Sequence, residues 1–191
     1  MPPSSEDLRE RLLAEAARLV DESGVGALTL RALAARAGVS RQAPYLCFAN
    51  KEALEAALAA EGLRREAQWV HDESAGDPKA RLYALARAHL RLRAEHPGLY
   101  VLAHGAVPKA ASAELQTLAA ERFASLREAI AAACPGEPDI QVIRQRCMIA
   151  WAMVRGFGEL AGMRSSPASV PGGPEQWALA GLDALLEAWT R

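Results

Sequence analysis

Basic and polar side chains are concentrated in one stretch of the sequence, Thr29 to Lys51, which contains no aspartate or glutamate. Its cations are Arg31, Arg36, Arg41 and Lys51. Guanidinium and ammonium groups attract phosphates, and arginine or glutamine can also hydrogen-bond to the edges of bases. The chemistry that suits this stretch is therefore recognition of a nucleic acid.

The histidines are the other side chains that could do chemistry, but their spacing matches no familiar metal site. None of them forms an HExxH pattern, and the chain has neither a glycine-rich phosphate loop nor a Gly-x-Ser-x-Gly elbow. We therefore expect no catalytic residues, no metal and no cofactor. An enzymatic alternative would require turnover that disappears when His104 or Arg155 is replaced.

The basic stretch is predicted to fold as two short helices joined by a glycine turn. Apolar residues with helical spacing are Leu30, Leu33 and Ala34. Thr29 suits the N-cap of the first helix, Gly38 can adopt the positive φ that ends it, and Ser40 can cap the second. A helix-turn-helix has this shape, and its second helix enters the major groove. An ordinary α-hairpin remains the alternative.

A second helix that begins near Ser40 would carry its base-reading side chains in the first turn. Arg41 could then bond to guanine O6 and N7, Gln42 could pair with adenine, and Ala43 could touch a thymine methyl group. Cys47 would lie one turn further on the same side as Ala43. Alternatively, Arg41 and Gln42 are merely solvated, and Cys47 is a small packing residue or a redox sensor.

Residues 16–58 resemble the N-terminal domain of TetR-type transcriptional regulators. The positions that carry the resemblance are Ala17, Gly24, Thr29, Leu33, Ala34, Gly38, Val39, Ser40, Tyr45, Phe48, Lys51, Glu52 and Leu54. The resemblance implies that Thr29, Tyr45 and Lys51 hold the DNA backbone and that Phe48 is a core residue. The predicted DNA-binding residues are Thr29, Arg31, Ser40, Arg41, Gln42, Ala43, Tyr45, Cys47 and Lys51.

The composition predicts an all-α fold with about nine helices. The 191 residues are 51% hydrophobic and 24% charged, aromatics are only 5%, and the net charge is -1. Residues 1–65 hold nine Arg or Lys and nine Asp or Glu, so nine minus nine leaves this part neutral. We expect a three-helix helix-turn-helix domain over residues 1–65 and a helical bundle for ligand binding and dimerisation over residues 66–191.

Breaks in the apolar pattern predict where the other helices begin and end. The expected helices are Ser5–Glu22, one capped by Asn50 and running to about His71, Lys79–Glu95, Leu99–Ala106, Ser112–Ala133, Ile140–Met163 and Glu175–Trp189. The first break is SAGDP at 74–78, and RSSPASVPGGP at 164–174 is expected to be a mobile linker.

The predicted helix at 140–163 is apolar on more than one side, and the last helix is also largely apolar. A two-fold partner would cover both, which gives a four-helix interface between the last two helices of each copy. A monomer that covers its own helices is the alternative. No leader and no apolar run of about 18 residues is present, and three scattered cysteines suit a reducing interior. The predicted location is cytoplasmic, away from any membrane.

The C-terminal part resembles the ligand-binding domains of a TetR branch with an EHPGLY-like turn and a Trp-His-Gly signature. Here the turn is 95–100, and the signature reads Trp151, Arg155, Gly156, with arginine in place of histidine. The predicted ligand-binding residues are Tyr100, His104, Cys147, Trp151, Arg155 and Phe157. Arg155, if buried beside Trp151, would favour an acidic or aromatic ligand. Ordinary packing is the alternative for each residue.

These expectations combine into a homodimeric regulator, most often a repressor in this family, that binds a palindromic operator. A small-molecule effector would release it by favouring a form whose reading helices are no longer about one DNA turn, ~34 to 36 Å, apart. The alternative function is a ligand-binding or interaction module that has lost specific DNA binding, which Pro44, Cys47 and the neutral N-terminal domain suggest.

Overall fold

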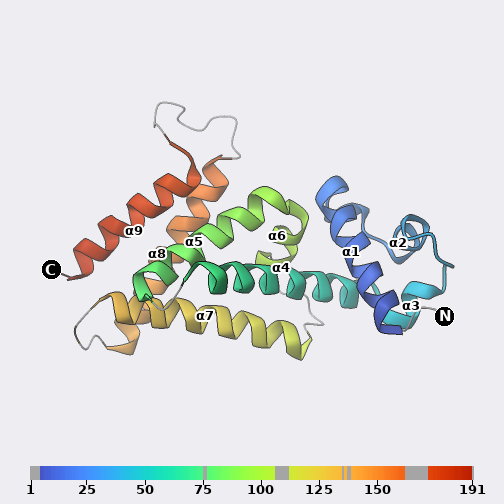
Figure 1. Cartoon of the computed structure of the whole chain (residues 1–191), viewed down its shortest axis with the longest axis horizontal. Helices are drawn as coiled ribbons and strands as arrows, with labels where there is room; N and C mark the ends of the chain where they lie inside the picture. The colour runs from blue at the N-terminus through green and yellow to red at the C-terminus, as the bar shows by residue number, and fades with distance from the viewer. Residues whose placement is uncertain are drawn as a thin grey trace. The chain divides into compact units, whose positions relative to one another are not determined.

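The computed structural model describes residues 5–74, 77–105, 112–134, 136, 139–161 and 172–190, and its regular structure within these ranges is entirely helical (Figure 1). The elements are α1 (Ser5–Ser23), the 3-10 turn η1 (Val25–Ala27), α2 (Leu30–Arg36), α3 (Ala43–Cys47), α4 (Lys51–Glu73), α5 (Pro78–Glu95), α6 (Pro97–His104), α7 (Ala113–Ala133), α8 (Ile140–Ala161) and α9 (Pro174–Thr190). The predicted all-α class is confirmed. Most of the expected linker at 164–174 lies outside the described residues.

The described helices form two compact units. The first contains residues 1–65 and 92–119, and the second contains residues 66–91 and 120–191. The first unit therefore adds α6, the end of α5 and the start of α7 to the predicted helix-turn-helix segment. The separate roles of residues 1–65 and 66–191 remain a prediction.

Helix α2 forms as the sequence predicts. The Thr29 hydroxyl oxygen accepts a hydrogen bond from the backbone N–H of Ala32 at 3.0 Å, which caps the first turn. Leu33 is fully buried, and Leu30 is nearly so. Gly38 ends the helix with φ of 65°. A side chain is strained at such a φ, which is why glycine suits this position.

The predicted start of the reading helix near Ser40 is wrong, because α3 begins three residues later, at Ala43. The reason is Pro44. In a helix that began at Ser40, Pro44 would have to donate to the Ser40 carbonyl, but proline has no N–H and its ring clashes there. The Ser40 carbonyl instead accepts from Ala43 N at 3.0 Å, in a turn, and Pro44 falls in the first turn of α3, where no donor is needed.

Helix α1 packs against α2, α3 and α6 within the first unit. Its residues Leu12, Ala16 and Val20 are buried. The close contact with α6 depends on Gly98, because a Cβ placed there would lie 2.3 Å from the carbonyl carbon of Val20. Any other residue would push the two backbones apart.

Asp21 of α1 holds the beginning of α6. Its carboxylate accepts from the backbone N–H of Gly98 at 2.9 Å and of Leu99 at 3.2 Å, and it bonds to His96 Nδ1 at 2.8 Å. The first N–H groups of a helix lack partners in their own helix, and they attract negative charge. His96, the residue before α6, makes no side-chain cap. Asp21 therefore caps α6 from a different helix.

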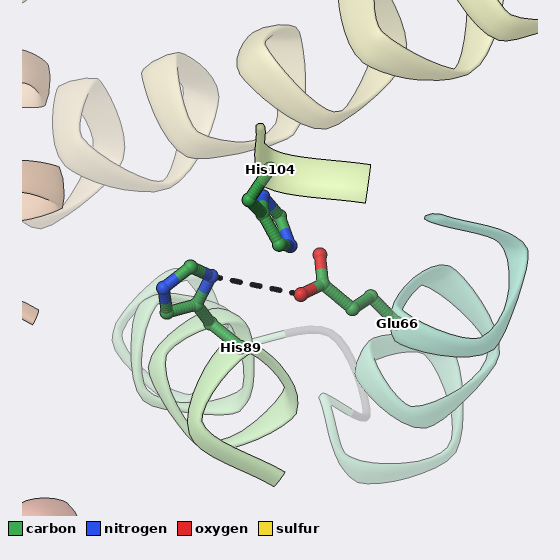
Figure 2. Close-up of side chains that lie close together, drawn as sticks. All are labelled: Glu66, His89 and His104. Carbon is green, nitrogen blue, oxygen red and sulfur yellow. Dashed lines mark ion pairs between the residues drawn. The ribbon is translucent and has the colours of Figure 1, made fainter. Parts of the chain in front are cut away.

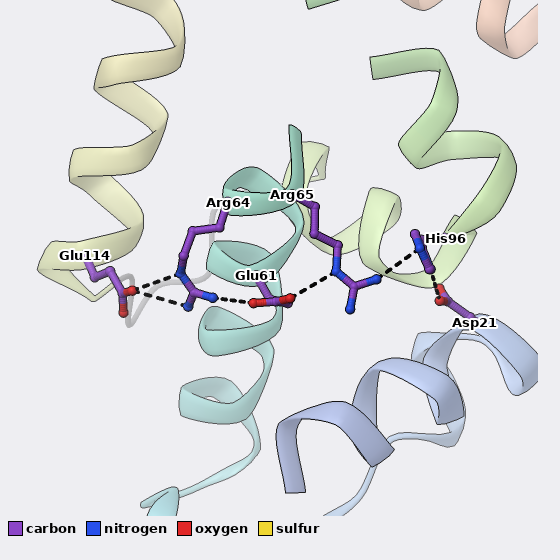
Figure 3. Close-up of polar contacts among 6 residues, drawn as sticks. All are labelled: Asp21, Glu61, Arg64, Arg65, His96 and Glu114. Atoms are coloured by element: carbon purple, nitrogen blue, oxygen red, sulfur yellow. Dashed lines mark hydrogen bonds and ion pairs between the residues drawn. The ribbon is translucent and has the colours of Figure 1, made fainter. Parts of the chain in front are cut away.

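Polar contacts continue from Asp21 across the first unit (Figure 3). Arg65 bonds to His96 Nε2 at 3.0 Å and to Glu61 at 3.0 Å, and Glu61 also pairs with Arg64. Arginine can only donate, so His96 Nε2 is the acceptor, and the proton on Nδ1 donates to Asp21. This network holds His96 between Arg65 of α4 and Asp21 of α1.

The second unit has its own apolar core, formed by α5, α7, α8 and α9. Fully buried members include Ile130, Cys147 and Leu182. The Tyr83 hydroxyl donates to Asp183, and this bond holds the pKa of the Asp183 carboxyl below its usual value. No helix among the described residues is long and apolar enough to cross a membrane.

We expect Gly98→Ala to destabilise the chain by about 2 kcal/mol or more, because backbone atoms of α1 would have to move to admit the methyl group. Urea denaturation measures the change. Gly26→Ala is the control, since a Cβ there meets nothing within 4 Å and Gly26 lacks a positive φ; its effect should stay within about 0.5 kcal/mol. Equal stability of the two variants would contradict the close approach of α1 and α6.

Candidate nucleic-acid interface and ligand cavity

Arg31, Arg41 and Gln42 are exposed in the first unit. Arg41 and Gln42 lie in the turn just before α3 and not in its first helical turn. Within the described part of the chain, neither Arg31 nor Arg41 has a carboxylate within ion-pair distance, so both charges are available to an external anion. Phosphate is an anion that proteins commonly bind close to the N-terminus of a helix.

The exposed face of α3 differs from the predicted one. Ala43 is buried, so it does not present a methyl group to solvent. Leu46 is 78% exposed and Tyr45 is 55% exposed. A single exposed leucine is normal on a protein surface, and Leu46 lies beside Tyr45 on the same outer side of α3. Sequence reasoning missed Leu46, although it follows directly from the helical position next to Tyr45.

The remaining predicted contacts are placed as follows. Ser40 is exposed and Cys47 is half-buried. Thr29 is exposed, and because its oxygen accepts from Ala32, its hydroxyl proton is still able to bond to a phosphate. Lys51 pairs with Glu55 at 3.4 Å on the surface. Exposed pairs of this kind are weak, so a phosphate can replace Glu55.

Arg36, although basic, is used to hold α2 against α1. Its guanidinium donates two bonds of 2.8 Å to Glu22 and one of 3.1 Å to Glu15. The hydrogen bond from Arg36 lowers the pKa of Glu22 below its usual value. The charge of Arg36 is therefore largely compensated within the protein, and the positive charge of the reading surface comes mainly from Arg31 and Arg41.

The predicted ligand-binding residues do not all lie in one unit. Tyr100 and His104 are on α6 of the first unit, with ring centroids 5.0 Å apart. The other four are on α8 of the second unit. Cys147 is fully buried in the core, and burial raises the pKa of its thiol. Phe157 packs against Trp177, with ring centroids 6.2 Å apart.

A cavity in the second unit contains one of these residues, Trp151. Its free space is about 380 Å³, counting the opening to solvent. The residues that line it are Leu82, Leu85, Ala86, His89, Arg122, Leu126, Ala150, Trp151, Val154 and Leu182. Of this space, only about 30 Å³ is open to the centre of a water-sized sphere. Mostly apolar walls with a few polar groups are typical of a small-molecule site. Arg155 does not line it.

A buried polar cluster borders this cavity. Arg122 Nε lies 2.8 Å from a carboxylate oxygen of Glu66, and Arg122 Nη2 lies 3.3 Å from His89 Nδ1. Glu66 of α4 and His89 of α5 are both buried and face one another (Figure 2). The distance between His89 Nδ1 and Glu66 Oε1 is 3.6 Å. The Nδ1 atom of His89 therefore lies close to both the guanidinium of Arg122 and the carboxylate of Glu66.

Two polar residues at apolar positions of helical patterns in the sequence indicate this cluster. His89 continues the apolar stripe of Leu82, Leu85 and Ala86 at helical spacing, so a polar group was to be expected on a buried face. Arg122 likewise stands four residues before Leu126. A polar residue inside an apolar stripe is informative because burial requires a partner. The pattern does not reveal which partner it is.

Helices α2 and α3 follow one another through a turn at Gly38, as the two helices of a helix-turn-helix do. Residues 12–58 match the family model described as bacterial regulatory proteins, tetR family. This matching segment contains both α2 and α3. A comparison with curated proteins gave no match.

Several solved structures resemble the chain over nearly its whole length. A protein of unknown function from Rhodococcus sp. RHA1 is 26% identical, with a TM-score of 0.79 and coverage of 96% of both chains. The TetR family regulator PfmR from Thermus thermophilus is 24% identical, with a TM-score of 0.65 and coverage of 93% of this chain and 97% of that one. AibR, solved with isovaleryl coenzyme A and operator DNA, is 19% identical, with a TM-score of 0.65 and coverage of 96% and 98%. These are likenesses of fold.

We expect Arg36→Gln to raise the pKa of Glu22 toward 4.5, because the hydrogen bond from Arg36 is the main cause that lowers it. Carbon NMR of the carboxyl group during a pH titration measures this. A lowered folded-state pKa means that the pair stabilises the fold above the unfolded pKa, and that this stabilisation is lost as the pH falls through the folded pKa.

Arg18→Gln is the matched control for this titration, since Arg18 acts on Glu22 only through its charge and is the weakest of the causes. It should leave the pKa of Glu22 nearly unchanged. The same shift in both variants would show that general charge, and not the bond from Arg36, lowers this pKa.

Proposed function

We propose that the chain is a DNA-binding transcriptional regulator of the TetR type, a cytoplasmic homodimeric repressor that releases a palindromic operator when a small molecule binds. The observation that carries the proposal is the exposure of Arg31, Arg41 and Gln42 at α2 and α3, within the segment that matches the TetR family. Such side chains bind phosphates and base edges.

The roles of these residues follow from their positions. Arg41 and Gln42 precede α3 and are assigned to base edges, with Leu46 as an apolar contact on the same short helix. Thr29, Tyr45 and Lys51 are assigned to the DNA backbone, which fixes register without reading sequence. Arg31 adds charge next to Thr29.

Dimerisation is supported by the surface of α8. Five of its apolar side chains are exposed, each by more than a third: Ile140, Val142, Met148, Ile149 and Leu160. In α9, by contrast, Leu182 and Leu186 are already buried within the chain. A second copy would cover the apolar side of α8, so this helix supplies most of the proposed four-helix interface.

Ligand control is supported by the cavity of the second unit, and AibR shows that a protein of this fold has been solved with both a ligand and operator DNA. The proposed mechanism is a shift of populations, in which the ligand prefers a form with wrongly spaced reading helices. The difference between the affinities of the two forms for the ligand bounds how far release can go.

A second candidate function is a ligand-binding module that has lost specific DNA binding. The observations that favour it are the length of α3, five residues, and the compensation of Arg36 by Glu22 and Glu15. Both functions retain the cavity, so only DNA binding distinguishes them.

Selection of DNA from a random duplex pool by the full-length protein tests the proposed function. We expect enrichment of one short inverted repeat whose half-sites lie about 34–36 Å apart, or a multiple of that. The affinity should fall steeply with salt, because counterions are released from the phosphates. A pool that shows no enrichment at low ionic strength would leave the ligand-binding module as the better interpretation.

Single substitutions separate base from backbone contacts. Arg41→Ala should cost about 1–3 kcal/mol of binding at one base position and relax the preference there, whereas Lys51→Ala should weaken binding to all sequences alike. Affinities across a randomised operator library measure both. Arg18→Ala, which removes an exposed positive charge from α1, is the control for a general charge effect. Equal losses across the library for Arg41 and Lys51 would show that the division is wrong.

A further inference from the structure

We propose that the cavity of the second unit binds a neutral, mainly apolar molecule that carries a carbonyl oxygen, and that Trp151 Nε1 donates a hydrogen bond to this oxygen. The inference rests on the proposed function, because it assigns the class of effector. Three properties of the cavity support it: apolar walls, an unsatisfied donor and a charge that is already neutralised.

Apolar side chains from four helices form the walls. They include Leu82 of α5, Leu126 of α7, Val154 of α8 and Leu182 of α9. A ligand gains affinity here by removing its own apolar surface, and that of the walls, from water. A strongly polar molecule such as a sugar would lose its bonds to water without replacing them. The body of the ligand is therefore hydrocarbon-like.

The indole of Trp151 supplies the polar specificity. Its Nε1 is buried, and no atom among the described residues accepts a hydrogen bond from it. An indole N–H can only donate, and a buried donor without an acceptor is unfavourable. Trp151 lines the cavity, so an oxygen acceptor on a ligand can satisfy it. A ligand without an acceptor leaves this donor unpaired.

Charge decides between a carbonyl and a carboxylate. The cation at the cavity wall is Arg122, and it is paired with the buried carboxylate of Glu66 at 2.8 Å. A carboxylate ligand would either add a second negative charge beside Glu66 or draw Arg122 away and leave Glu66 buried without its partner. Both outcomes are costly at low dielectric. A carbonyl oxygen requires neither.

This differs from the expectation that Arg155, if buried beside Trp151, would favour an acidic or aromatic ligand. Arg155 does not line the cavity, and the arginine that does, Arg122, has its charge compensated. His89 lies beside the same carboxylate, with Nδ1 3.6 Å from a Glu66 oxygen, so any positive charge on its ring would also be compensated. Preference for a neutral ligand is therefore a property of the whole cluster.

Three probes with equal chain length test the proposal on the full-length protein: octan-2-one, octanoate and oct-1-ene. The four tryptophans give four indole N–H signals in a nitrogen-15 spectrum, and Trp151→Phe identifies that of Trp151. We expect octan-2-one to bind most tightly and to move the Trp151 signal downfield, as a new hydrogen bond does. Oct-1-ene should bind more weakly without this shift, and octanoate should bind more weakly than the ketone near neutral pH.

A variant of Trp151 separates the effect of its hydrogen bond from the effect of how well the ligand fits the cavity. Trp151→Phe keeps an aromatic ring but removes the donor, so the affinity for octan-2-one should fall about 2- to 10-fold while that for oct-1-ene stays nearly constant. Trp69→Phe is the matched control, because Trp69 does not line the cavity and instead packs under Arg91, 4.3 Å from its ring centroid. It should change neither affinity.

Tighter binding of octanoate, or binding of the ketone with an unchanged Trp151 signal, would overturn the assignment of ligand class. Such a result leaves the proposed function intact if the same protein, without any probe, still selects an inverted repeat from random DNA. Conversely, a protein that binds octan-2-one through Trp151 but selects no DNA would contradict the regulator and keep the ligand assignment.

Discussion

Two consecutive acidic residues at the end of α1, Asp21 and Glu22, link this helix to α6 and to α2. Acidic groups in the last turn of a helix face the negative end of its dipole, so Asp21 and Glu22 are unfavourable there unless other groups compensate them. Asp21 is compensated by the first N–H groups of α6, and Glu22 by the guanidinium of Arg36 in α2. The last turn of α1 therefore contacts both α6 and α2. The absence of a side chain at Gly98 makes the first of these contacts possible.

The short α3 shows why this bracing is needed. A helix of five residues does not persist alone in water, because nucleation costs more than one turn of hydrogen bonds returns. Its inner side is held by burial of Ala43 and Pro44, and Phe48 directly after it is 3% exposed, with Arg9 of α1 above its ring. Burial of this side leaves Tyr45 and Leu46 on the outside. The surface that we propose contacts DNA is thus a consequence of which side chains α1 and α2 cover.

Local physics made much of the fold predictable. Capping residues and apolar spacing give α2, and the Asn50 side chain caps α4 as expected, accepting from Ala53 N at 2.8 Å. The start of α3 could also have been derived, since the chemistry of Pro44 was visible in the sequence. The pairs between distant residues could not be derived from the sequence. Arg36 and Glu22 are 14 residues apart in the chain, and Arg122 and Glu66 are 56 apart, and no short-range pattern encodes such separations. The cavity needs four helices at once, which explains why only Trp151 of the predicted ligand-binding residues was placed in its wall.

The pair of half-buried Arg122 and buried Glu66 is poorly explained by stability. Removing both charges from water is expensive, and apolar residues of similar volume often serve a core equally well or better. The pair has a clearer role beside the cavity, where it places a guanidinium in the wall whose charge is compensated, and where both partners contact His89. A carboxylate alone would repel acceptors, and an arginine alone would collect anions. Together they leave a wall that tolerates a neutral acceptor next to Trp151, which is the property that an effector site for an uncharged carbonyl compound needs.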